Sequence, residues 1–143
     1  MDESKMAATK AWLTKARNDL DTARLISASP EGHLDAAIYH CQQAAEKAVK
    51  GFLISRGAAF QKTHDVEQLV DVAMEQDESF SAWLNEAAML TPLATAYRYP
   101  SEGALFDPPP AEFAEALAAA AKIYAHVLSR LPDEVHPEPS TNR

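Results

Sequence analysis

A high alanine content combined with very little glycine limits the folds open to this chain more than any other feature. Roughly a fifth of the 143 residues are alanine, and only 4 are glycine. Alanine is the strongest helix former, and the apolar residues recur at the three- and four-residue spacing of an amphipathic helix. No segment shows the strict alternation of a half-buried strand. The sequence therefore predicts an all-α protein.

Apolar periodicity predicts three long helices, over about residues 5–28, 33–56 and 110–131. In each helix the apolar residues follow one stripe, which a neighbouring helix must cover. Gly57 is expected to end the second helix in a left-handed conformation, because glycine adopts positive φ without steric cost. The expected core stripe of the first helix comprises Leu13, Ala16, Leu20, Ala23 and Ser27.

Two shorter helical segments lie between these long helices. We expect Thr63 to be the N-cap of a short third helix, with His64 and Asp65 in its first turn. A fourth helix is expected from Asp77 or Ser79 to about residue 97. Within it, residues 91–92 are a Thr-Pro pair, which predicts a kink or a restart with the threonine as the new cap.

The predicted fold is an antiparallel up-and-down bundle of four main helices plus the shorter third helix, because short links make consecutive helices antiparallel neighbours. Residues 1–131 form one domain in this interpretation, and residues 101–110 form a proline-rich loop. Residues 132–143 contain three prolines and no apolar periodicity. We therefore expect a disordered C-terminal tail.

Charge and cysteine content limit the classes of function. The formal net charge is −8, so the whole molecule should repel polyanions, although a local basic pocket can still bind phosphate. Cys41 is the single cysteine, which excludes an internal disulfide and agrees with a reducing, cytoplasmic location. No run of about 18 apolar residues is present, so we expect no membrane span.

The sequence contains none of the common metal or cofactor motifs. No glutamate is followed three residues later by histidine, as in di-iron bundles, and no His-Glu-x-x-His helix is present. Glycine-rich phosphate loops and Gly-x-Ser-x-Gly elbows are also absent. We predict no metal and no cofactor.

A polar stripe runs beside the apolar stripe of the second helix. Tyr39, Gln43, Glu46 and Lys50 recur at four-three-four spacing, with Gln42 and Lys47 beside them. One interpretation is a solvated face, on which an i,i+4 pair between the glutamate and the last lysine contributes a few tenths of a kcal/mol. The alternative is a groove or a dimer-facing surface.

Arg98 is the sharpest candidate for a ligand-binding residue. It lies between Tyr97 and Tyr99 and is followed by Pro100, which ends the helix. Arginine at a helix C-terminus often only complements the helix dipole. A guanidinium flanked by aromatic rings can also bind a phosphate beside a stacked base.

Four segments together resemble the HEPN domain family (higher eukaryotes and prokaryotes nucleotide-binding). They are Ala16-x-x-Asp19-Leu20-x-x-Ala23, the run from His40 to Lys50, Lys62-Thr63-His64-Asp65, and Arg98-Tyr99-Pro100. Their order and spacing match over about residues 11–131. The resemblance implies a helical homodimer that binds a nucleotide or RNA. For bacterial members it also implies a minimal nucleotidyltransferase as partner in a toxin-antitoxin pair.

The chain departs from the ribonucleases of this family, which carry an arginine followed after four to six residues by histidine. Arg98 matches the arginine, but the corresponding positions are Gly103, Ala104 and Leu105. Three hypotheses follow. The first, which we favour, is binding of a nucleotide, an RNA end or a partner without catalysis. The second is a metal-independent ribonuclease in which His64 replaces the absent histidine, and the third is a structural homodimer without a ligand.

These hypotheses rest on polar and aromatic residues of the second helix, of the start of the third helix, and around Arg98. The candidate catalytic residues are His64 and Arg98. The candidate ligand-binding residues are Tyr39, Gln43, Glu46, Lys47, Lys50, His64, Asp65, Arg98 and Tyr99.

Overall fold

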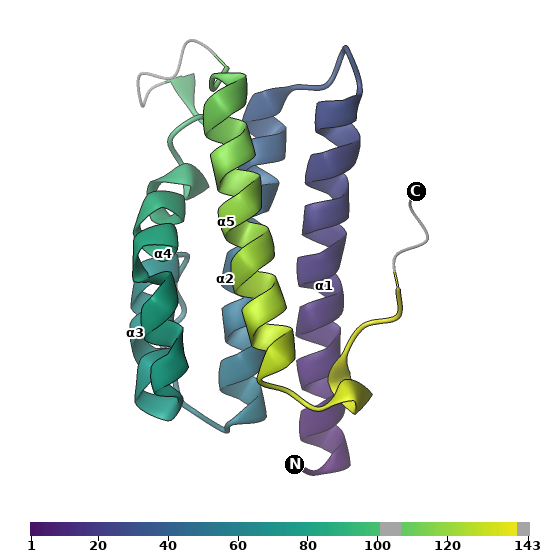
Figure 1. Ribbon diagram of the computed structural model, residues 1–143, viewed down its shortest axis with the longest axis vertical. Coiled ribbons are helices and arrows are strands. Elements are labelled where there is room, and N and C mark those ends of the chain that lie inside the picture. Colours follow the sequence, from purple (N-terminus) through teal and green to yellow (C-terminus); the bar gives the residue numbers. More distant parts are fainter. Residues whose placement is uncertain (101–106, 140–143) are drawn as a thin grey trace.

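The computed structural model describes residues 1–100 and 107–139, and within them all regular secondary structure is helical, with no strand. The α-helices are α1 (Glu3–Ala28), α2 (Leu34–Ser55), α3 (Val66–Gln76), α4 (Leu84–Leu90) and α5 (Pro110–Ser129). Three 3-10 segments accompany them, namely η1 (Glu78–Trp83), η2 (Thr91–Ala94) and η4 (Asp133–Val135). The predicted all-α helical bundle is confirmed (Figure 1).

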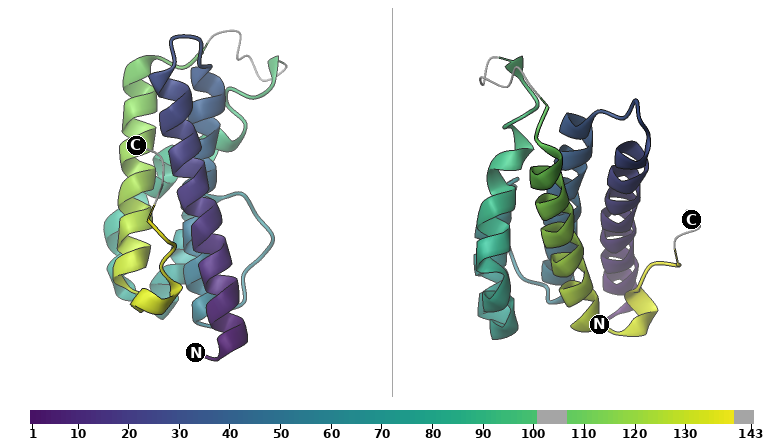
Figure 2. Two further views of the ribbon diagram at one scale, coloured as in Figure 1. Left: turned by 90° about the vertical axis from the view of Figure 1, so that its right-hand side faces the viewer. Right: turned by 45° about the horizontal axis from the view of Figure 1, so that its top comes forward.

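Helix α2 lies at the centre of the bundle, because it packs against α1, α5 and α3. The long helices α1, α2 and α5 run side by side along one axis, with α3 and α4 on the side of α5 away from α1 (Figures 1 and 2). The largest fully buried side chains include Leu13, Ile38, Phe52, Leu53, Leu69, Phe80 and Ile123. Most of the predicted stripe on α1 is buried, but Ser27 is exposed near the end of that helix.

The end of α2 follows the prediction for Gly57. This glycine has a φ of 65°, and its N–H donates to the carbonyl of Ile54. The N–H of Ala58 donates to the carbonyl of Leu53. These two bonds form a Schellman motif, which satisfies carbonyls that the end of a helix leaves unpaired.

Helix α3 begins two residues later than the sequence suggested. Asp65 is its N-cap, since its carboxylate accepts a hydrogen bond from the N–H of Gln68 at 3.0 Å. Thr63 instead accepts from the N–H of Asp65 and so forms a turn before the helix. The expectation of a Thr63 cap was therefore wrong, because aspartate is a better cap than threonine and stands two residues closer to the apolar run.

The predicted fourth helix is a sequence of three short segments, η1, α4 and η2. Asp77 caps η1 by accepting from the N–H of Ser79 at 3.0 Å. Thr91 keeps helical backbone angles and its hydroxyl donates to the carbonyl of Ala87, so the chain restarts as η2 without a threonine cap. Pro92 in the first turn of η2 explains the restart, since proline cannot continue the hydrogen-bonding pattern.

Residues 132–139 pack against the bundle, which differs from the expected disordered tail. Val135 is fully buried, and the His136 ring contacts the carbonyl oxygens of Leu128 and Leu131 through Nε2. Segment η4 lies against α1, near the N-terminus (Figure 1). The buried valine and the contact of the imidazole with carbonyls at and after the end of α5 attach this segment to the bundle. Residues 140–143, and residues 101–106 of the predicted loop, lie outside the described part.

Candidate functional site

The polar stripe of α2 is buried, so the interpretation as a solvated face was wrong. Gln42 is 0% exposed, Glu46 3%, Lys50 7% and Gln43 9%. Buried polar groups are stable only when they are hydrogen-bonded, and buried charges only when they are paired. The contacts of this stripe therefore decide whether it is structural or available to a ligand.

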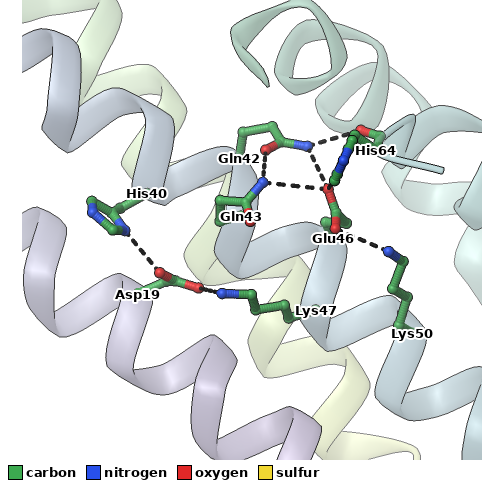
Figure 3. A network of polar contacts seen from close by, with 8 residues as sticks. All are labelled: Asp19, His40, Gln42, Gln43, Glu46, Lys47, Lys50 and His64. Carbon is green, nitrogen blue, oxygen red and sulfur yellow. Dashed lines mark hydrogen bonds and ion pairs between the residues drawn. The ribbon is translucent and has the colours of Figure 1, made fainter. Parts of the chain in front are cut away.

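Glu46 is the centre of a saturated network, which Figure 3 shows. Its Oε1 accepts from Gln42 Nε2 at 3.1 Å, from Gln43 Nε2 at 3.4 Å and from His64 Nδ1 at 3.0 Å. Its Oε2 accepts from Lys50 Nζ at 3.0 Å. Four donors contact this carboxylate, which is 3% exposed, so its charge is satisfied within the protein.

The same network fixes the segment that precedes α3. Gln42 Nε2 also donates to the backbone carbonyl of His64 at 2.9 Å, and Gln42 Oε1 accepts from Gln43 Nε2 at 2.7 Å. Lys50 Nζ lies 5.7 Å from the centre of the Trp12 ring, within the range of a cation–π interaction. The network thus connects α1, α2 and the link between α2 and α3, and it contacts both the backbone carbonyl and the ring of His64.

Arg98 stands in a different environment, on the surface between two tyrosine rings. Its Cζ lies 4.0 Å from the ring centre of Tyr39 and 5.8 Å from that of Tyr99. The pKa of Arg98 is raised above its usual value, chiefly by a hydrogen bond with the side chain of Tyr99. Within residues 1–100 and 107–139 it forms no ion pair with a carboxylate. The guanidinium is therefore charged, oriented and accessible to an external anion.

Two pockets share the wall that Tyr39, Arg98 and Tyr99 form. The smaller pocket has a volume of about 210 Å³, and Gln43 and His64 line its other side. The larger pocket has a volume of about 510 Å³, and its lining includes Asp35 and His40. Both pockets are open at the surface, so a phosphate can reach Arg98 from either side.

The structure brings five of the nine candidate ligand-binding residues around one pocket. They are Tyr39, Gln43, His64, Arg98 and Tyr99. Glu46 and Lys50 form the buried network behind this pocket, while Asp65 caps α3. Lys47 points to the other side of α2, where its Nζ lies 2.7 Å from Asp19 Oδ2 (Figure 3).

Sequence reasoning missed two residues near this site, His40 and Asp19. His40 Nδ1 lies 2.8 Å from Asp19 Oδ1, and Asp19 is only 7% exposed. A signal was present, because Asp19 lies three residues after Ala16 and four before Ala23, which places it on the core stripe of the first helix. An ionisable residue on that stripe needs a partner from a neighbouring helix.

Cys41, the neighbour of His40, takes no part in this chemistry. It is fully buried, and burial raises the pKa of its thiol to about 12. A protonated thiol is a poor nucleophile and a poor metal ligand. Among the residues that the structure describes, no group of three histidine, cysteine or acidic side chains is placed to hold a metal ion. No helix in the same part of the chain is both long and apolar enough to cross a membrane.

Comparison with known proteins agrees with this architecture. A family model described as HEPN domain matches residues 9–131. The chain belongs to the HEPN domain family. It is also similar to two solved structures, and the alignments cover almost all of those two chains. A comparison with curated proteins found no match.

The first of these structures is an archaeal HEPN homologue, ST0689, which is 25% identical with a TM-score of 0.65. The alignment covers 85% of this chain and 96% of that one. The second is TT1696 from Thermus thermophilus, which is 28% identical with a TM-score of 0.67. Its alignment covers 86% of this HEPN protein and 98% of that chain.

Proposed function

We propose that this HEPN domain binds the phosphate of a nucleotide or of a single-stranded RNA end at Arg98. The observation that carries the proposal is the guanidinium, which lies 4.0 Å from the Tyr39 ring and has no carboxylate partner among the described residues. Arginine binds phosphate oxygens through two parallel hydrogen bonds, and the tyrosine rings hold it in place.

Tyr99 supports a nucleotide over a bare anion. Its side chain is 48% exposed beside the guanidinium, which leaves an aromatic face available for stacking. Stacking of a base on an aromatic side chain contributes about 1–3 kcal/mol. The net charge of −8 opposes binding along a long polyanion, so we expect recognition of one or a few nucleotides.

Substitution of Arg98 tests this function directly. We expect Arg98→Ala to weaken the binding of a short fluorescent single-stranded RNA by about 10-fold or more, since a charge-assisted hydrogen bond contributes about 1.5–3 kcal/mol. Fluorescence anisotropy in the presence of EDTA measures the dissociation constant. Arg24→Ala is the matched control, because it removes an equal charge from an exposed position on α1. Equal loss in both variants would show that only the overall charge matters.

Metal-independent RNA cleavage with His64 is a second candidate function. The observation that favours it is that His64 and Arg98 line the same pocket of about 210 Å³, although 34 positions separate them in the sequence. In this candidate the imidazole supplies the proton acceptor that the sequence lacks after Arg98. Loss of RNA cleavage in His64→Asn, with retained RNA binding, is the result that this candidate requires.

The partners expected from the family also enter as proposals. We propose a homodimer and a nucleotidyltransferase partner in a toxin-antitoxin pair on the family membership alone, and a cytoplasmic location on the single cysteine. Sedimentation analysis of the purified chain tests the dimer. If neither nucleotide nor RNA raises the melting temperature, the third hypothesis of a structural homodimer gains support, because a ligand of the folded state must stabilise it.

A further inference from the structure

A groove between α1 and α5, called here the α1/α5 groove, lies apart from the Arg98 site and has no role in the proposed function. Its pocket has a volume of about 330 Å³ and is open at the surface. Leu20, Ala121 and Leu128 are apolar parts of its lining, and Tyr124 adds an aromatic ring. The groove shares no lining residue with the two pockets beside Arg98. It is therefore a separate concave surface of the protein.

Residues 132–139, the C-terminal strap, close one side of this groove. The strap leaves the end of α5, crosses to α1 and runs along the line between the two helices (Figures 1 and 2). Pro137, Glu138 and Pro139 belong to the pocket lining. His136 has a φ of −69° and a ψ of 136°, which are close to the polyproline II values. A polyproline II segment makes no internal hydrogen bonds, so its carbonyls are free to accept from the helices.

Two cations of α1 hold the strap. Arg17 Nη1 donates a hydrogen bond to the backbone carbonyl of Glu138. Lys10 Nζ forms an ion pair with the carboxylate of the same residue at 3.4 Å. Arg24 and Asp21 also line the groove, but they lie 3.8 Å from each other, so their charges compensate. The groove therefore presents positive charge to the strap, although the whole chain has a net charge of −8.

The strap satisfies these groups only in part. Arg17 Nε is buried and has no hydrogen-bond partner among the described residues. A backbone carbonyl offers one oxygen to a guanidinium, whereas a carboxylate accepts two parallel hydrogen bonds from it. The Glu138 carboxylate pairs with Lys10 instead, and its side chain is 83% exposed, so this ion pair contributes little. Val135 is the only fully buried side chain of the strap. The strap is thus an imperfect ligand of the groove that it occupies.

We infer that the α1/α5 groove binds an extended, acidic, proline-containing segment of a partner protein, and that the C-terminal strap occupies the groove until such a segment displaces it. A partner carboxylate at the position of the Glu138 carbonyl satisfies more of the Arg17 guanidinium than the strap does. Prolines hold the segment extended before it binds, and an aromatic ring such as that of Tyr124 suits them. Burial raises the pKa of Tyr124, so its hydroxyl stays protonated and can donate to a peptide carbonyl.

The test uses a fluorescent peptide that copies residues 132–139, Pro-Asp-Glu-Val-His-Pro-Glu-Pro. In the full-length parent protein, the strap competes with this peptide at an effective concentration in the millimolar range. Val135→Asp places a charge at a buried position and should release the strap. We expect this variant to bind the peptide about 10-fold more tightly than the parent protein or better, as measured by fluorescence anisotropy. Equal affinities would overturn the inference, because the strap would then not compete for the groove.

A milder variant keeps the test valid if the charged one disturbs the bundle. Val135→Ala removes apolar contacts without burying a charge, and we expect a smaller gain in peptide affinity in the same direction. Circular dichroism should show the helix content of the parent protein in both variants. A folded Val135→Ala variant with no gain in affinity would contradict displacement of the strap.

Arg17→Ala, combined with Val135→Asp, tests the groove itself. We expect the peptide affinity to fall by about 10-fold, since a hydrogen bond from a charged group is lost. Lys122→Ala in the same background is the matched control, because it removes an equal charge from an exposed position of α5 outside the pocket lining. Equal loss in both variants would show that only overall charge attracts the peptide, and it would overturn the inference.

Changes in the peptide test the chemistry of the partner. Replacing its acidic residues by their amides, or its prolines by alanine, should each weaken binding severalfold. A peptide that binds equally well without its charges or without its prolines would overturn the stated chemistry. Dimer formation by Val135→Asp in sedimentation analysis, without peptide binding, would assign the groove to the strap of a second copy instead. Val135→Asp should bind RNA as the parent protein does, so this inference and the proposed function fail separately.

Discussion

Two polar clusters meet at the smaller pocket, and they differ in how completely their charges are satisfied. In the Glu46 cluster, formed by Gln42, Gln43, Glu46, Lys50 and His64, one carboxylate accepts from four donors. In the Arg98 cluster, formed by Tyr39, Arg98 and Tyr99, the guanidinium has only aromatic neighbours among the described residues. A charged group whose partners all lie within the protein stabilises the fold, whereas a charged group without an ion-pair partner can bind a ligand.

The comparison explains why two polar clusters that both include side chains of α2 receive different roles. Glu46 is 3% exposed, so removal of any of its partners leaves an unpaired polar group away from water. Arg98 is exposed, and water replaces any partner that it lacks. We therefore expect mutations in the first cluster to affect stability and mutations in the second to affect binding.

The largest expected effect is the loss of stability in Glu46→Ala. Without the carboxylate, Lys50 keeps a buried charge that lacks its ion-pair partner, and two glutamines lose an acceptor. Breaking a buried pair in this way costs about 3–5 kcal/mol of the free energy of unfolding. Urea denaturation followed by circular dichroism measures the change.

Glu75→Ala provides the matched control for this variant, since Glu75 is an exposed carboxylate on α3. Its free energy of unfolding should stay within about 0.5 kcal/mol of that of the parent protein. A Glu46→Ala variant as stable as this control would contradict the view that the Glu46 cluster is structural.

A smaller effect is expected from pH at a third site, which lies apart from both clusters. His126 Nε2 and Ser79 Oγ share a hydrogen bond of 2.9 Å, and the ring packs against Phe80 and Trp83. Burial lowers the pKa of His126, against the attraction of Asp77 and together with the repulsion of Arg130. The unfolded chain then binds this proton more tightly than the folded one.

The sign of the pH effect follows from this difference. The contribution of neutral His126 is fully present above its ordinary pKa of 6.5 and is lost as the pH falls towards the lower folded pKa. We expect the free energy of unfolding to fall between pH 7 and pH 5 more steeply in the parent protein than in His126→Gln. Urea denaturation at both pH values gives the two slopes. Equal slopes would show that protonation of His126 does not affect stability.

The smallest expected effect on stability is that of Arg98→Ala. The side chain is exposed and its contacts are with the ring faces of Tyr39 and Tyr99, so the free energy of unfolding should change by no more than about 1 kcal/mol. Thermal unfolding of the same preparation that is used for RNA binding gives this value. A loss as large as that of Glu46→Ala would make Arg98 part of the structural framework and remove the contrast between the clusters.

Much of the fold could be predicted because the signals are local. Alanine content and apolar periodicity indicate helices along most of the chain. Gly57 ends α2 because only glycine adopts positive φ without strain. The predictions failed where two local signals compete. Asp65 and not Thr63 caps α3, and Pro92 follows a threonine that keeps helical angles.

The site was predictable only in part, because burial is not a property of a single helix. The four-three-four spacing shows that Tyr39, Gln43, Glu46 and Lys50 share a face, but it does not show what covers that face. The link between α2 and α3 covers the part around Glu46, where the Gln42 amide binds the His64 carbonyl. For the same reason, periodicity did not indicate that His40 meets Asp19 across two helices.

Neighbouring residues along the chain were enough to specify the helices, the end of α2 and the position of an arginine between tyrosines. Packing of the helices against one another then decided which polar residues are buried with all their hydrogen bonds made, as in the Glu46 cluster. It also left the guanidinium of Arg98 exposed to a ligand. Packing also placed residues 132–139 against the bundle through Val135. The physical reason is that pairing of charges and exclusion of water depend on contacts between helices, which periodicity within one helix does not specify.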